Sequence, residues 1–176
     1  MNGDAWLEEI LSRYKEQKSL ADRAIAQLSD TALFATLDAD ANSVAVIMKH
    51  LAGNLRSRWT DFLGSDGEKP DRARDTEFEM SGDTRADLVA RWENAWRIVV
   101  DSIGSLNDHD LARTVVIRGE PHSVVQAISR NMTHTAQHVG QIVFLAKHLA
   151  GASWKTLSIP RGASDEFTRR LRDQRI

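Results

Sequence analysis

The stretch "PHSVVQAISRNMTHTAQHVGQIVFLAKHL", residues 121–149, predicts one long amphipathic helix. Its apolar residues recur at spacings of three and four, which places them on one face of a helix with 3.6 residues per turn. These residues are Val124, Ile128, Met132, Val139, Ile142, Val143 and Ala146. Pro121 suits the first turn of a helix, where a missing N–H is tolerated, and Gly151 suits the position after the last turn.

The same helical spacing of apolar residues recurs in three other segments: residues 4–28, 41–63 and 84–106. Asp4 is the expected N-cap of the first segment, and Asn42 or Ser43 that of the second, because short polar side chains accept hydrogen bonds from exposed N–H groups. The sequence therefore predicts four long helices.

Residues 64–83 carry glycine, proline and alternating charges, which predicts a long surface loop between the second and third helices. Residues 114–119, "TVVIRG", are β-branched and end in glycine, which indicates a brief extended piece. We predict an all-α protein, a four-helix up-down bundle, forming a single domain over residues 1–176. Its C-terminal tail, residues 150–176, is expected to pack on the bundle before a short basic end helix.

The composition excludes several classes of function. The chain has 176 residues and a formal net charge of −2, so no overall basic field attracts nucleic acid or anionic membranes. It has no cysteine, which excludes disulfides, a cysteine nucleophile and thiolate metal ligands from the protein. No signal-peptide pattern and no long apolar run stand out, so a cytoplasmic protein is expected.

His134 and His138 stand four residues apart on the fourth predicted helix, so they differ by about 40° around it and by roughly 6 Å along it. Two imidazoles at this spacing can bind one metal ion. His148 lies on nearly the same face but about 15 Å beyond His138, too far to join them. His109 and His122 lie in or beside polar segments and are expected at the surface.

His50 lies at the margin of the apolar face of the second predicted helix, as His134 does on the fourth. Together with His138 they would form a three-histidine site with open coordination positions, a common set for catalytic zinc that also suits nickel, iron or manganese. The alternative is that all three are ordinary boundary histidines, each satisfied by a hydrogen bond. The sequence pattern by itself leaves both interpretations open.

Two segments, "VIMKHLAGNL" (46–55) and "HTAQHVGQIVFLAKHL" (134–149), resemble the DinB/YfiT-like superfamily of four-helix-bundle proteins. The closest likeness is to its uncharacterised DUF1572 family, and it extends to "MKHLAGNLRSRWTDFLGSDGEKPDR" (48–72) and "WKTLSIPRGAS" (154–164). The resemblance implies a divalent metal ion, often zinc or nickel, bound by one histidine of the second helix and an HxxxH pair of the fourth. In this chain those residues are His50, His134 and His138.

The resemblance also implies a class of chemistry, because characterised relatives include metal-dependent transferases that use low-molecular-weight thiols such as bacillithiol or mycothiol. We therefore expect a metal-dependent enzyme, a thiol transferase or a hydrolase, acting on a small molecule. Asn54 and Gln141, each about one helical turn from a candidate ligand, could orient the histidines or a bound ligand. No carboxylate is well placed to act as a general base, which favours binding of a thiol or another substrate to the metal over hydrolysis.

A non-catalytic interaction protein is the alternative function. It would form a homodimer through the helix faces that carry Trp59, Trp92 and Trp96, with a structural metal or none. The helical spacing of these tryptophans matches the apolar faces, however, so we expect them in the core.

Overall fold

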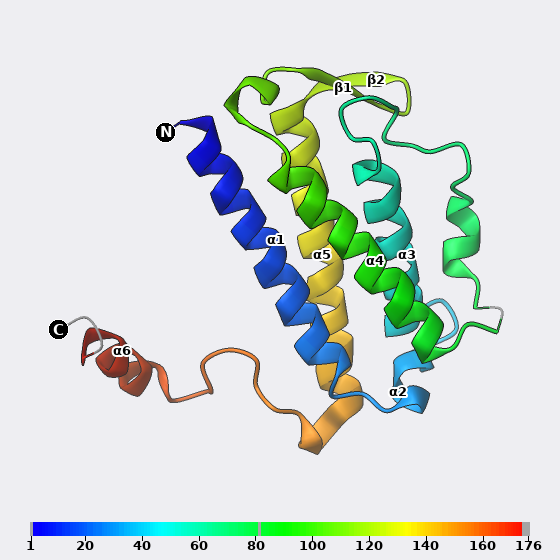
Figure 1. The fold of residues 1–176 in the computed structure, drawn as a ribbon. Coiled ribbons are helices and arrows are strands. Elements are labelled where there is room, and N and C mark those ends of the chain that lie inside the picture. Colours follow the sequence, from blue (N-terminus) through cyan, green and yellow to red (C-terminus); the bar gives the residue numbers. More distant parts are fainter. Residues whose placement is uncertain (1, 81, 174–176) are drawn as a thin grey trace.

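The computed structural model describes residues 2–80 and 82–173. Four long helices lie side by side (Figure 1), and they are α1 (Gly3–Ile25), α3 (Val44–Trp59), α4 (Arg85–Gly104) and α5 (Val124–Ala150). Helix α1 packs against α4 and α5, and α3 packs against the same two helices. The prediction of a mainly helical protein is therefore confirmed.

Shorter elements connect or follow the long helices within the described residues. They are the helices α2 (Asp30–Phe34) and α6 (Ser164–Asp173), the 3-10 turns η1 (Arg74–Phe78), η2 (Asp108–Asp110) and η3 (Gly151–Ser153), and the strands β1 (Thr114–Ile117) and β2 (Glu120–Ser123). The two strands pair antiparallel and form a hairpin. This hairpin includes the extended piece predicted at residues 114–119.

An up-down bundle requires successive long helices to run in opposite directions, and the structure differs from this prediction. Helices α3 and α4 run in the same direction, because the connection between them passes back along the outside of α3 (Figure 1). Residues 60–84 form this connection, and η1 lies against α3 within it. A connection of this length can span a helix of about 24 Å, so neighbouring helices need not alternate.

The start of α5 also differs from the prediction. The helix begins at Val124, and the Ser123 side chain accepts a hydrogen bond from the Gln126 N–H at its first turn. Pro121 lies instead in β2, opposite Val116. A proline that lacks an N–H is tolerated in a hairpin with only two strands. The predicted end is confirmed, because Gly151 follows the helix with a positive φ of 54°.

At the other helix starts, one of the predicted N-caps is confirmed. Ser43 accepts a hydrogen bond from the Val46 N–H at the start of α3. Helix α1, by contrast, begins at Gly3 with Asn2 as its cap, so the assignment of Asp4 was wrong by two residues. Asp4 instead accepts a hydrogen bond from the Asp108 N–H.

The core lies between the four long helices and is rich in aromatic side chains. Trp59, Trp92 and Trp96 are each at most 2% exposed, which confirms their predicted core positions. The ring of Tyr14 from α1 packs edge-on against Trp59 and Trp96. These tryptophans are therefore not available to form the interaction surface of the alternative function.

The C-terminal tail packs only in part. Trp154 and Leu157 lie against the core, and the Gln27 side chain exchanges hydrogen bonds with the backbone of Lys155. Ile159 is 40% exposed, and α6 lies away from the long helices with no buried residue in its described part (Figure 1). The predicted packing thus holds for the first residues of the tail but not for its helix.

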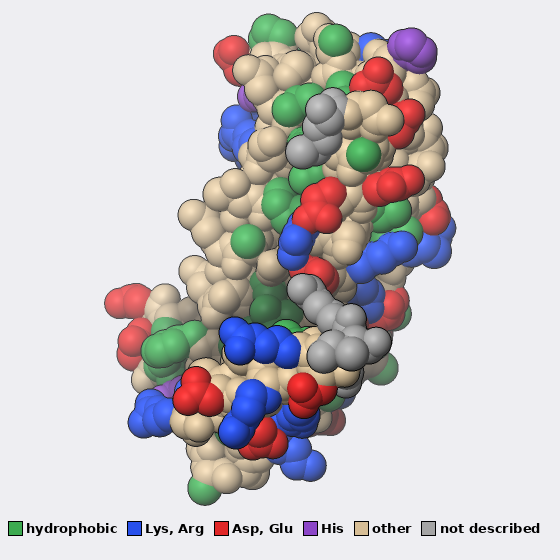
Figure 2. Space-filling view, turned by 90° about the vertical axis from the view of Figure 1, so that its left-hand side faces the viewer, with side chains coloured by type: hydrophobic (Ala, Val, Ile, Leu, Met, Phe, Trp, Pro, Cys, Tyr) green, Lys and Arg blue, Asp and Glu red, His purple; other side chains and the backbone are tan. Residues whose placement is uncertain are grey.

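The molecular surface carries charges of both signs. On the face shown in Figure 2, acidic and basic side chains are interspersed. Among the described residues, none of the helices combines the length and the apolar character needed to cross a membrane.

Candidate metal centre

The structure brings His50, His134 and His138 together between α3 and α5. The Nε2 atom of His134 lies 3.4 Å from Nε2 of His50 and 3.2 Å from Nε2 of His138. One candidate ligand atom from each ring lies within 4.8 Å of the other two. We refer to these three residues as the histidine triad.

Helix geometry explains this convergence. His134 and His138 are one turn apart on α5, so their rings lie on the same face, with centroids 4.5 Å apart. Helix α3 packs against that face and contributes His50, whose ring is also flanked by Phe78 at 4.8 Å. His50 is buried, whereas the two histidines of α5 are half-buried.

The outer nitrogens of two of the rings are engaged by acceptors. Nδ1 of His50 lies 2.9 Å from Oε2 of Glu77, and Nδ1 of His138 lies 2.8 Å from Oε1 of Gln141. Each acceptor requires the proton on Nδ1, which leaves the lone pair on Nε2 facing the other rings. Gln141 therefore occupies the orienting position predicted for it. Nδ1 of His134 is buried and has no hydrogen-bond partner among the described residues.

Glu77 was not predicted from the sequence. It lies in η1, and its buried carboxylate also accepts two hydrogen bonds from Arg72, at 2.8 and 2.9 Å. Burial by itself would raise the pKa of this carboxyl, but the hydrogen bonds from His50 and Arg72 outweigh it and lower the pKa. Glu77 is therefore an anion at neutral pH and can only accept in its hydrogen bond with His50, so the proton of this bond belongs to Nδ1 of His50.

Gly53 on α3 makes room for this carboxylate. A Cβ atom at position 53 would overlap Oε1 of Glu77. Glycine in the middle of a helix usually costs about 0.5–1 kcal/mol relative to alanine. Here it allows Glu77 to lie against the helix backbone one turn from His50.

The pKa values of His134 and His138 favour neutral rings. Burial, together with the neighbouring His138 and His50, lowers the pKa of His134 to about 4. Burial also lowers the pKa of His138, against the opposing effect of its hydrogen bond to Gln141. Neutral imidazoles with converging lone pairs are the donor set that divalent transition metals bind, so the triad fits such an ion.

Asn54 takes part in a buried hydrogen-bond network, and its predicted role in orienting a bound ligand stays a prediction. Its amide oxygen accepts a hydrogen bond of 3.0 Å from Asn131, and it makes none to the triad within the described structure. Asn131 in turn accepts hydrogen bonds from the Tyr14 hydroxyl and the Trp59 indole, each at 2.9 Å. This buried network joins α1, α3 and α5 directly beside the triad.

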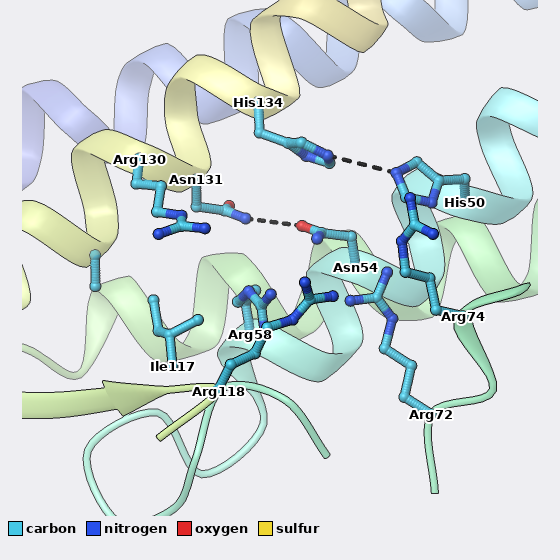
Figure 3. A pocket seen from close by; sticks show the side chains of 11 residues that line it. His50, Asn54, Arg58, Arg72, Arg74, Ile117, Arg118, Arg130, Asn131 and His134 are labelled. Atoms are coloured by element: carbon cyan, nitrogen blue, oxygen red, sulfur yellow. Dashed lines mark hydrogen bonds between the residues drawn. The ribbon is translucent and has the colours of Figure 1, made fainter. Parts of the chain in front are cut away.

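A cavity of about 210 Å³ opens next to the triad (Figure 3). His50 and His134 form part of its wall, together with Asn54 and Asn131. A small molecule in this cavity would therefore lie against two of the three rings.

The remaining histidines lie outside the site. His148 and His109 are exposed, and His122 is half-buried in β2, with its Nδ1 at 2.9 Å from the Glu120 carbonyl oxygen. The prediction that placed His109 near the surface is therefore confirmed, and His148, as expected, does not belong to the triad.

Comparison with known families agrees with these observations. Residues 2–163 match the model of a family described as "Protein of unknown function (DUF1572)". The chain belongs to the DUF1572 family. The match covers all four long helices, the connection that carries Glu77, and the three histidines of the triad. None of the curated proteins matches this DUF1572 member.

Proposed function

We propose that His50, His134 and His138 bind one divalent transition-metal ion, with zinc or nickel the most suitable. The observation that carries this proposal is the convergence of three Nε2 atoms, 3.2–3.4 Å apart around His134. Hydrogen bonds from His50 to Glu77 and from His138 to Gln141 support it, because metal-bound histidines usually donate such a bond from their outer nitrogen.

We further propose that the metal centre is catalytic and acts on a small molecule. Three protein ligands leave coordination positions free, and the cavity beside His50 and His134 gives a ligand access to them. A divalent ion at such a site lowers the pKa of a bound water or binds a thiolate. We also propose that the chain is a member of the DinB/YfiT-like superfamily and forms a single domain over residues 1–176.

Between the two reaction classes, the site favours a transferase that uses a low-molecular-weight thiol. Hydrolysis needs a general base within reach of the attacking water. Among the described residues, neither Asp nor Glu lines the cavity. Glu77, whose carboxylate contacts the outer nitrogen of His50, is already bound by Arg72 at both oxygens.

Elemental analysis of protein purified without chelators tests the metal proposal. We expect about one zinc or nickel ion per chain, and its loss in His50→Ala and His138→Ala. His148→Ala is the matched control, because His148 lies on the same helix but is exposed and outside the triad. Wild-type protein that contains no metal and cannot be loaded with zinc or nickel would refute the proposal.

Ligand exchange distinguishes a catalytic from a structural metal. A catalytic site should take up azide, imidazole or a thiol at its free position, and cobalt substitution would report this as a change in the visible spectrum. Metal that stabilises the fold but exchanges no ligand would support the structural alternative. Homodimerisation remains a prediction, to be checked by the molar mass in solution, and Trp59, Trp92 and Trp96 cannot carry it because they are buried.

A further inference from the structure

Five arginines surround the cavity beside the triad (Figure 3). They come from four different parts of the chain: Arg58 from α3, Arg72 and Arg74 from the connection between α3 and α4, Arg118 from the turn of the hairpin, and Arg130 from α5. Such convergence is not required by helix packing, because long charged side chains normally extend into solvent.

Fewer carboxylates than guanidinium groups lie nearby. Glu68 is shared by Arg58 at 3.1 Å, Arg118 at 3.0 Å and Arg72 at 3.4 Å. Glu77 is engaged by Arg72 and His50. With Asp66, whose charge interacts with Arg58, three carboxylates face the five arginines, so the wall keeps an excess of positive charge.

Arg130 and Arg74 are the least engaged of the five. Within the described residues, Arg130 pairs with neither Asp nor Glu, and its Nη1 atom only approaches Nε2 of His122, at 3.4 Å. Arg74 lies over the Phe78 ring and pairs at 3.4 Å with Asp75, whose side chain is 96% exposed. An ion pair so open to solvent contributes little, so both guanidinium groups remain able to bind an anion.

Two of the arginines are held in place away from solvent. The side chain of Arg72 is 3% exposed and that of Arg58 is 11% exposed. Burial outweighs the attraction of Glu68 and lowers the pKa of Arg58. A buried cation that its partners do not fully stabilise is further stabilised by a bound anion.

Arg118 provides a second, independent observation. It has a positive φ of 56° in a two-residue turn with Gly119, whose φ is 77°. Such turns favour Asn or Gly at the first position, since other side chains are strained there. Asp66 fixes the turn by accepting hydrogen bonds from the N–H groups of Arg118 and Gly119, each at 2.8 Å. Strain of this kind often marks a functional position.

We propose that this cavity binds the phosphate group of a small-molecule substrate. Guanidinium groups bind phosphate oxygens in pairs, and a dianion matches the excess positive charge better than a single carboxylate does. The cavity, at about 210 Å³, is smaller than the roughly 300 Å³ at which pockets for drug-sized ligands begin, so only a small part of the substrate enters it. The substrate assignment rests on the proposed function, because the phosphate would hold the reacting group beside the triad.

Calorimetric titration with inorganic phosphate tests this site directly. We expect wild-type protein to bind phosphate, with an affinity that falls as the salt concentration rises. Arg130→Gln and Arg118→Asn should each weaken binding roughly tenfold or more, because each removes a charged hydrogen-bond donor. Arg118→Asn suits the left-handed backbone, so it should not unfold the hairpin.

Two further variants separate this proposal from that of the metal. Arg97→Gln is the charge-matched control, because Arg97 is exposed on α4 and outside the cavity, and it should bind phosphate as wild type does. His138→Ala should lose the metal yet still bind phosphate, since His138 does not line the cavity. Phosphate binding that is absent in wild type, is unchanged in Arg130→Gln and Arg118→Asn, or is no tighter than binding of succinate would overturn the proposal, whatever the metal content.

Discussion

Replacing Glu77 with Gln is the most direct test of how the triad is organised. The carboxylate accepts one hydrogen bond from His50 and two from Arg72, at distances of 2.8–2.9 Å. Gln at this position offers one acceptor oxygen and an amide group that can only donate. One of the two partners must therefore face a donor, and the proton on Nδ1 of His50 is no longer fixed by a charged acceptor.

The expected effect on metal affinity follows from this loss. Removing the hydrogen-bond partner of a metal-bound histidine typically weakens metal binding about 10- to 100-fold, which is about 1.4–2.7 kcal/mol. The unfolding free energy of the metal-free protein should also fall by about 1–3 kcal/mol, because a buried donor of Arg72 or His50 loses its acceptor. Competition with a chromophoric zinc chelator measures the first effect, and urea unfolding measures the second.

Glu79→Gln is the matched control for this experiment. Glu79 lies two residues further along the same connection and is exposed, so its replacement removes the same charge without touching the triad. If Glu77→Gln and Glu79→Gln bind zinc equally well, Glu77 does not position His50 in the metal-bound protein. Our interpretation of the site would then be wrong on this point.

Four further substitutions test the site and the packing around it. Gly53→Ala should weaken zinc binding about tenfold by displacing Glu77, although alanine normally stabilises a helix, and chelator competition checks it. Asn131→Leu should lower the unfolding free energy measured by urea unfolding by about 3 kcal/mol, because several buried polar groups lose their hydrogen-bond partner. Tyr14→Phe removes only one hydrogen bond and should lower it by about 1 kcal/mol. For Glu68, burial raises the pKa but the hydrogen bond from Arg118 and the nearby arginine charges lower it below the ordinary 4.5. Its ionised form therefore stabilises the folded protein above about pH 4.5, so wild type should exceed Glu68→Gln in unfolding free energy there, and the difference should vanish as the pH falls below the folded-state pKa.

The helices and the three histidines could be predicted because they depend on local periodicity. The apolar spacing of α5 defines its buried face, and the four-residue spacing of His134 and His138 follows from the helical turn. The pairing with His50 could be proposed from its similar position at the margin of an apolar face. Its contact with the other two depends on how α3 and α5 pack, which periodicity alone does not determine.

Glu77 could not be predicted, because nothing local distinguishes it from its neighbours. The segment "DTEFEM", residues 75–80, offers Asp75, Glu77 and Glu79, and only the geometry of the η1 turn selects the middle one. One signal was present in the sequence. Gly53 lies one helical turn after His50 inside an otherwise regular helix, and such a glycine often marks a close approach by another part of the chain.

The connection between α3 and α4 accounts for two differences from the prediction, the helix directions and the contact of Glu77 with His50. By returning along α3 it allows α3 and α4 to run in the same direction, and it carries Glu77 to the outer nitrogen of His50 (Figure 1). The same connection provides Arg72 and Arg74 at the cavity, and Glu68, which pairs with Arg72. The helices thus supply the candidate ligands, while a polar segment that the sequence presents as a surface loop orients one of them and forms part of the wall that a substrate would meet. Differences in substrate among proteins built on these helices are therefore expected to arise in this connection more than in the helices themselves.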